Sequence, residues 1–163
     1  MRRNPTVPLK EEVKYGHGFF RGEKCPLSGE DGVLVMSPRH LDQFGRVMAG
    51  VLRHFPDRFD LEMDKQGWIE ASEFIDAVKS QRRHFHYLET KHLQAVVETD
   101  PKGRYQLKNG RLRATYAHTL DLELDLPTDQ NPEHLYFACS KEDSTEYLEH
   151  GLYPGDRNMV HLS

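Results

Sequence analysis

The 163-residue sequence has little cysteine and no long apolar run, and these absences exclude several classes of protein. Its two cysteines, Cys25 and Cys139, are too few for a disulfide framework. The apolar stretches are only a few residues long, too short to span a bilayer, and the N-terminus lacks the apolar core of a signal peptide. We therefore expect a cytoplasmic protein with no membrane contact.

The sequence also lacks an excess of positive charge and the common catalytic signatures. A net charge of −4 argues against a broad nucleic-acid-binding surface, although it allows a local basic site. The glycine-rich stretch "GHGFFRG" does not end in the Lys-Ser/Thr pair of a phosphate-binding loop. No nucleophile elbow and no clear carboxylate pair is present, so function must depend on another pattern.

The periodicity of the chain predicts an α+β fold with a winged-helix lobe followed by a β-rich lobe. A helix is expected over residues 37–56, where Ser37 can cap the start and Pro56 stops the end. A short strand or turn, a helix capped near Ser72, and a helix in "TKHLQAVVETD" follow. The Asn109-Gly110 pair then predicts a two-residue β-hairpin turn. Helix, strand, two helices and a hairpin are the elements of a winged helix.

Three regions result. Residues 1–36 are an N-terminal extension, in which residues 1–12 are expected to be poorly ordered and the next stretch to form a loop or small hairpin. Residues 37–116 are the winged-helix lobe. Residues 117–163 contain the alternating segment "HTLDLELDLP", further short strands, and a short helix "STEYLEH" that ends at Gly151. This last lobe is expected to be incomplete.

Arginine and histidine are the candidate functional residues. Alternation along "RLRATYA" places Arg111 and Arg113 on one face of the hairpin strand. A guanidinium can hold a phosphate with two hydrogen bonds, so such arginines fit an anion site. They also fit a solvated hairpin, which is the more common case because most surface arginines have no further role. Residue spacing alone leaves both readings open.

A metal site is not expected. His17 and Cys25 lie where a zinc knuckle could form, but structural zinc takes four ligands, usually cysteine or histidine. Ser28 stands where the second cysteine of a Cys-x-x-Cys pair would be.

Longer motifs resemble the tRNA/RNA 2′-phosphotransferase family, especially its archaeal members. The resemblance lies in "VLRHFPDRFDLEMDKQGWIEASEF", then "DPKGRYQL" and "RLRATYAHT", then "LYFACS" and "GLYPGDRNMVHLS", in that order. It implies an N-terminal winged-helix lobe and a C-terminal ADP-ribosyltransferase lobe. It also implies removal of an internal RNA 2′-phosphate with NAD as co-substrate. The phosphate attacks the nicotinamide ribose, nicotinamide leaves, and a ribose hydroxyl then releases the RNA and forms ADP-ribose cyclic phosphate.

The resemblance also assigns site residues. The catalytic set would be Arg53, His54, Arg113 and Arg157. Residues facing NAD would be His118, Thr119, Tyr136, Phe137, Ala138 and His161. The arginines would neutralise and orient the phosphate, whereas Arg111 would face solvent or at most touch the RNA backbone.

The sequence departs from the family where "YFAC" replaces a usual Tyr-His-Gly-Thr and where Ala117 replaces a usual glycine. We also expect the last strands of the family's second lobe to be absent from these 163 residues. Two alternatives therefore stay open. One is a winged-helix RNA-binding module without catalysis, and the other is an ADP-ribosyltransferase acting on a different phosphate. The expected partner is RNA carrying a 2′-phosphate, with no protein partner, and the expected state is a monomer.

Overall fold

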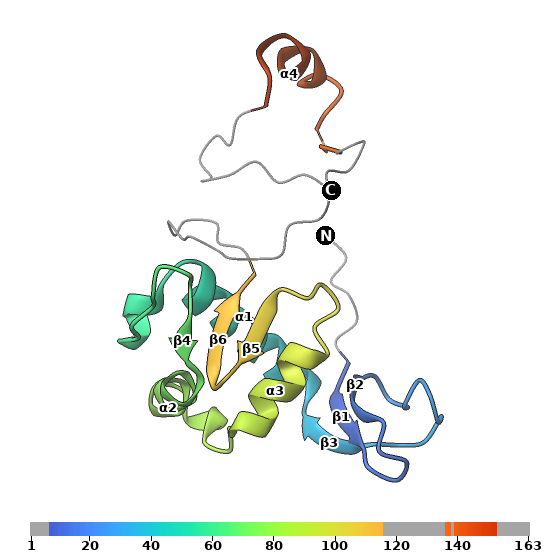
Figure 1. Cartoon of the computed structure of the whole chain (residues 1–163). Helices are drawn as coiled ribbons and strands as arrows, with labels where there is room; N and C mark the ends of the chain where they lie inside the picture. Colours follow the sequence, from blue (N-terminus) through green and yellow to red (C-terminus); the bar gives the residue numbers. More distant parts are fainter. Residues whose placement is uncertain (1–6, 116–135, 138, 153–163) are drawn as a thin grey trace.

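The structure, a computed structural model, describes residues 7–115, 136, 137 and 139–152. In this part of the chain two small sheets and several helices form a mixed arrangement, with a helical layer between the sheets (Figure 1). The predicted α+β class is confirmed. None of the helices in the described ranges is long and apolar enough to cross a membrane.

The N-terminal sheet contains β1 (Leu9–Glu12), β2 (Gly18–Arg21) and β3 (Val33–Met36) in the antiparallel order β2-β1-β3. The expectation of poor order is wrong for Leu9–Glu12, because this segment is the central strand. Leu9 is fully buried and belongs to the hydrophobic core. Glu11 forms an ion pair at 2.6 Å with Lys91, which lies in the helix over Thr90–Glu98. The strand is thus held by pairing on both edges and by a tertiary ion pair.

The first helix, α1 (Pro38–Arg53), matches its prediction closely. The Ser37 hydroxyl accepts a hydrogen bond from the backbone N–H of His40, and Pro38 occupies the first turn. One face is buried, and it carries Leu41, Phe44, Met48, Val51 and Leu52. The chain leaves the helix at His54 and enters a 3-10 turn, η1 (Pro56–Phe59).

A short strand and two further helices follow: β4 (Ile69–Glu70), α2 (Ala71–Gln81), the 3-10 turn η2 (Arg83–Phe85) and α3 (Thr90–Glu98). The helix expected to be capped near Ser72 begins one residue earlier and has no side-chain cap, because its first turn continues directly from β4. There the N–H of Ala71 donates to the carbonyl of Gly110 in the hairpin turn instead.

The predicted hairpin is confirmed as β5 (Tyr105–Lys108) and β6 (Arg111–Ala114), joined at Asn109-Gly110, both with positive φ. The sheet order is β4-β6-β5, so β6 is the central strand. Leu112, Arg113 and Ala114 are all buried, and only Arg111 is exposed. Of the two readings of this hairpin, the solvated one therefore fits Arg111 but not Arg113, because loop 64–68 covers Arg113.

One hydrophobic core joins both sheets to the helices. Phe44 on α1 lies 5.9 Å from the ring of Phe74 on α2 and 5.6 Å from that of Phe85 on η2. All three rings are fully buried. Leu9 and Met36 of the N-terminal sheet belong to the same core as Leu112 of β6. Residues 7–36 thus pack on the helical domain.

Further along, α4 (Ser144–His150) ends at Gly151, whose φ is 82°, as predicted. The strands expected in "HTLDLELDLP" and "RNMVHLS" lie outside the described residues. The domain boundaries at residues 36 and 116 stay predictions.

We expect Phe44→Ala to lower the free energy of unfolding by about 3–5 kcal/mol, since it removes a fully buried ring that contacts two others. Leu34→Ala is the control, because Leu34 is 58% exposed on β3 and should change stability by less than about 0.5 kcal/mol. Urea unfolding of both variants tests this. Equal losses would contradict the placement of the core.

Candidate functional site

Arg113 is the best-ordered candidate of the set, because its guanidinium is held on three sides. Only 4% of the residue is exposed. Its Nε donates to Oε1 of Gln106 at 2.7 Å, one Nη donates to the carbonyl of Gln66 at 3.3 Å, and the group lies 4.3 Å from the ring centre of Trp68. Stacking on an aromatic face and directed hydrogen bonds fix the orientation of this cation.

Loop 64–68 brings Trp68 and Gln66 to Arg113. The Asp64 carboxylate accepts hydrogen bonds from the backbone N–H groups of Gln66 (2.9 Å) and Trp68 (3.0 Å). The Asp64 N–H donates to the Trp68 carbonyl, and Gly67 takes a φ of 85° that suits glycine. An Asx turn thus folds the loop back over β6.

Arg111, two residues away on the same strand, has a different environment. It is exposed, and its guanidinium pairs with Glu70 at 3.2 Å and with Asp64 at 3.6 Å. These exposed pairs tie the hairpin to β4 and to loop 64–68. Arg111 therefore links strand β6 to β4 and to loop 64–68 at the surface, next to the buried Arg113.

Arg53 and His54 stand at the C-terminal end of α1. Arg53 is its last residue and His54 its cap, with the His54 N–H donating to the carbonyl of Gly50 at 3.1 Å. Both are half-buried. Basic groups are favoured at a helix C-terminus, where the last carbonyls carry partial negative charge. The next residue, Phe55, has its ring 5.5 Å from that of His54.

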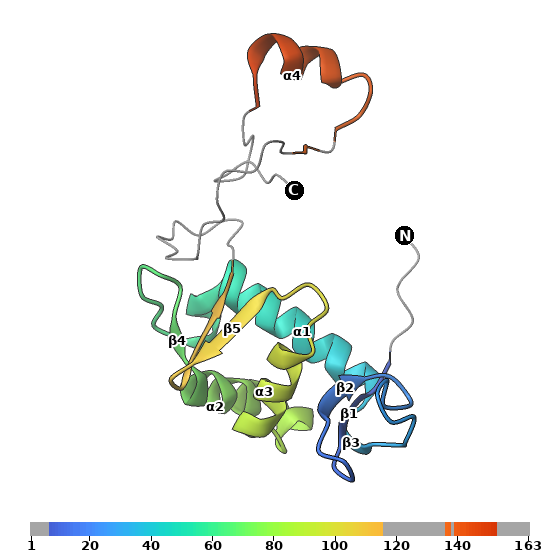
Figure 2. The same ribbon diagram turned by 45° about the vertical axis from the view of Figure 1, so that its right-hand side comes forward.

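The structure brings these two parts of the candidate site together at one end of the domain. Helix α1 packs against β6, and both views show its last turn beside the end of β6 that leads into the following chain (Figure 2). The elements that carry Arg53, His54 and Arg113, about 60 residues apart in sequence, thus pack against each other, and Arg113 lies under loop 64–68.

The other predicted site residues are only partly described. Arg157, His118, Thr119, Ala138 and His161 lie outside the described residues. Tyr136 is 69% exposed, and the Phe137 ring packs edge-on to Tyr147 of α4 at 5.2 Å. The assignment of these positions to NAD stays a prediction.

Sequence reasoning missed Gln106, Gln66 and Trp68 as the partners of Arg113. One signal was available, because a two-residue turn at Asn109-Gly110 pairs Gln106 with Arg113 directly across the hairpin. The position of Trp68 depends on the Asx turn at Asp64, which has no comparably clear pattern.

Residues 12–28 do not fit a zinc ion. His17 Nδ1 lies 3.5 Å from Cys25 Sγ and 3.6 Å from the buried carboxylate of Glu12. Lys14 pairs with Glu30 at 2.9 Å instead of offering a ligand. Among the described residues, no three His, Cys, Asp or Glu side chains are arranged so that they could hold a metal ion, whereas structural zinc takes four ligands. Hydrogen bonds hold this turn together.

Burial raises the pKa of the Cys25 thiol, but hydrogen bonds from the Ser28 hydroxyl, from the backbone N–H groups of Ser28 and Leu27 and from His17 lower it to about 7. Burial likewise raises the pKa of Glu12, yet hydrogen bonds from the N–H groups of His17 and Tyr15 bring it below its ordinary value. These hydrogen bonds thus stabilise the charged form of both groups relative to an isolated side chain.

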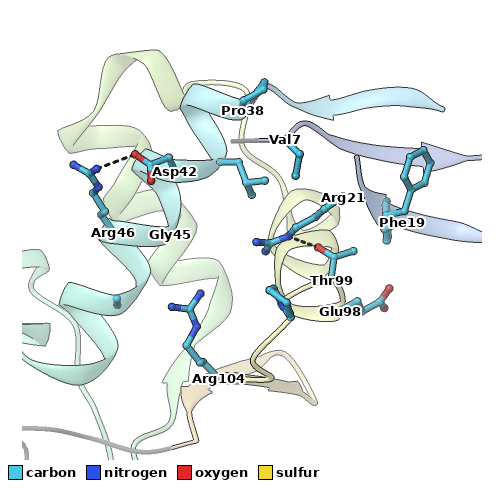
Figure 3. A pocket seen from close by; sticks show the side chains of 14 residues that line it. Val7, Phe19, Arg21, Pro38, Asp42, Gly45, Arg46, Glu98, Thr99 and Arg104 are labelled. Carbon is cyan, nitrogen blue, oxygen red and sulfur yellow. Dashed lines mark hydrogen bonds and ion pairs between the residues drawn. The ribbon is translucent and has the colours of Figure 1, made fainter. Parts of the chain in front are cut away.

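A cavity of about 880 Å³ lies between β2, α1 and the end of α3 (Figure 3). Arg21, Arg46 and Arg104 line it, and each is already engaged. Arg21 donates to Thr99 and to the carbonyl of Val96, Arg46 pairs with Asp42 at 3.0 Å, and Arg104 pairs with Asp100 at 2.9 Å. Two carboxylates, Asp42 and Asp100, thus neutralise two of the three cations that line the cavity.

Comparison with known proteins supports the resemblance noted in the sequence. The profile of the RNA 2′-phosphotransferase, Tpt1 / KptA family matches residues 39–163. A probable RNA 2′-phosphotransferase of Thermoplasma volcanium is 37% identical over 153 residues, covering 93% of this chain and 65% of its own. Probable RNA 2′-phosphotransferase 1 of Archaeoglobus fulgidus is also 37% identical, over 94% of this chain and 70% of its own.

The chain belongs to the RNA 2′-phosphotransferase family. It spans 65% of the length of the Thermoplasma relatives and 70% of the Archaeoglobus relative.

We expect Ser28→Ala to raise the pKa of the Cys25 thiol from about 7 toward its ordinary value of about 8.5, since it removes a hydrogen bond to the thiolate. Thiolate absorbance titrated against pH in a Cys139→Ser background measures this. Ser80→Ala is the matched control, because that hydroxyl bonds within α2. An unchanged Cys25 titration in Ser28→Ala would contradict the hydrogen-bonded turn.

Proposed function

We propose that this protein removes an internal 2′-phosphate from RNA by transferring it to NAD, with a tRNA splice junction as the RNA class. The observation that carries the proposal is the buried, oriented guanidinium of Arg113 on β6, the strand that packs against α1, whose C-terminal end carries Arg53 and His54. The reaction class follows from the membership of the chain in the RNA 2′-phosphotransferase family.

Residues 37–116 would be the winged-helix lobe that receives the RNA. The order helix, strand, helix, helix, hairpin over the described part, with the sheet order β4-β6-β5, supports this assignment. Residues 117–163 would begin the ADP-ribosyltransferase lobe. The RNA would then meet NAD where the end of β6 leads from the first lobe into the second.

The residues of this chain would act mainly by electrostatics and positioning. A 2′-phosphate monoester carries close to two negative charges at neutral pH, so it requires several cations to approach an electron-poor carbon. Arg113 offers a rigid fork, because Trp68 and Gln106 fix its plane. Arg53 and Arg157 would complete the charge balance, and His54 would orient the phosphate or move a proton.

NAD would supply the electrophilic ribose carbon and nicotinamide as the leaving group. A phosphate oxygen forms the new bond to that carbon as the bond to nicotinamide breaks. A neighbouring ribose hydroxyl would then displace the RNA 2′-oxygen from phosphorus, and the proton that this hydroxyl loses would balance the one that the leaving 2′-oxygen takes up to become a plain 2′-hydroxyl. Atoms balance with nicotinamide and a cyclic phosphate of ADP-ribose as products.

Arg113→Lys tests the assignment, because lysine keeps the charge but loses both the fork and the stack on Trp68. We expect turnover to fall by about 10²–10³-fold. Arg111→Lys is the matched control on the same strand and should retain turnover within about twofold, since Arg111 is exposed. Release of nicotinamide and loss of phosphate are followed with a short RNA bearing one internal 2′-phosphate.

Equal activity in the two variants would remove Arg113 from the site. RNA binding by the unmodified chain with neither product would favour a recognition module without catalysis. Turnover that ignores the 2′-phosphate would favour an ADP-ribosyltransferase with another acceptor.

A further inference from the structure

A second basic region lies on the same helix as Arg53 but at its other end. It contains Arg39 and His40 at the start of α1, together with residues from the segment 82–87, which connects α2 to α3. We call these residues the arginine–histidine surface, and its members are Arg39, His40, Arg82, Arg83, His84, His86 and Tyr87. Except for His40 and Tyr87, which are half-buried, all of them are exposed.

Aromatic contacts hold the surface together. The His40 ring is stacked on Tyr87 with centres 5.6 Å apart and lies 5.4 Å from the ring of His84. His40 Nδ1 is 2.8 Å from the Tyr87 hydroxyl. Phe85, between these residues in sequence, is fully buried against Phe44. The core therefore anchors a row of rings whose outer members, His84 and His86, face solvent.

The arginines of this surface, Arg39, Arg82 and Arg83, form no ion pair with a carboxylate of the described residues. Arg46, Arg104 and Arg111, in contrast, each pair with an aspartate or glutamate. In a chain with a net charge of −4, three cations without such pairs on one small area are an anion-binding feature.

We propose that the arginine–histidine surface binds the RNA substrate at a site separate from the 2′-phosphate, with guanidinium groups on backbone phosphates and histidine rings against bases. Arginine and stacked rings side by side match single-stranded or loop RNA, which exposes both phosphates and base faces. The proposal concerns the same RNA as the proposed function and rests on it.

The geometry sets the reach of this contact. Arg39 and Arg53 are separated by almost the full length of α1, which is about 21 Å at about 1.5 Å per residue. Figure 2 shows the start of α1 descending to the β2-β1-β3 sheet, away from the end of β6. The surface would therefore contact nucleotides remote from the reacting phosphate, and a very short RNA would not reach it.

The double variant Arg82→Ala/Arg83→Ala tests the proposal in the full chain. We expect its affinity for an unmodified stem-loop RNA to fall about tenfold at low salt, and the slope of log affinity against log salt to become shallower by about 1.4. Turnover of a trinucleotide with one internal 2′-phosphate should stay unchanged. The matched control is Lys14→Ala/Lys24→Ala, which removes two exposed cations that already pair with carboxylates. It should bind like the wild type.

A variant that retains the wild-type affinity and salt slope would overturn the proposal. So would an unchanged RNA affinity accompanied by lost binding to phosphatidylserine vesicles, which would assign the surface to a membrane. Arg82→Lys/Arg83→Lys should recover most of the salt slope and thus exclude a folding defect. Failure of the proposed function has a different signature, because the wild type would then bind the stem-loop RNA but release no nicotinamide.

Discussion

The structure depends on the burial of β6, a four-residue strand hydrogen-bonded to β5 on one edge and to β4 on the other. Its apolar residues, Leu112 and Ala114, join the core beneath α1. Its one buried cation, Arg113, is covered by loop 64–68. A charged group is costly to bury unless hydrogen bonds and stacking replace its water, and Gln106, Gln66 and Trp68 provide both.

Much of the fold could be predicted from local signals. Ser37 and Pro38 marked the start of α1, and Asn109-Gly110 fixed the hairpin and its register. The N-terminal strand was missed because Lys10, Glu11 and Glu12 hide its alternation. Glu12 is buried by the turn that follows it, where it accepts three backbone hydrogen bonds. Burial of a carboxylate by such a turn leaves no periodic pattern in the sequence.

Sequence motifs selected candidate site residues, but the surroundings of these residues could not be predicted from the sequence. Motifs selected Arg53 and His54, which end α1, and Arg113, which lies on β6 where this strand packs against α1; their catalytic role stays a prediction. Strand alternation placed Arg111 and Arg113 on the same face. In the structure Arg111 is exposed and pairs with Glu70, whereas Arg113 is buried. Asp64 accounts for part of the difference between the two arginines. Its carboxylate folds loop 64–68 by accepting the N–H groups of Gln66 and Trp68, and it also pairs with Arg111. No sequence motif marks Asp64 for this role.

Arg113 lies on the central strand of a three-stranded sheet. The face of the sheet on which its side chain lies is therefore set by the pairing register of that strand. A change of one residue in the pairing of β5 with β6 would exchange the positions of Arg113 and its apolar neighbours across the sheet. Such a hairpin could retain its hydrogen bonds while presenting Leu112 or Ala114 to Trp68. The length of the turn at Asn109-Gly110 thus fixes the position of the Arg113 guanidinium as well as the pairing of the strands. An insertion in this turn would shift the register, whereas an insertion in an exposed loop would not.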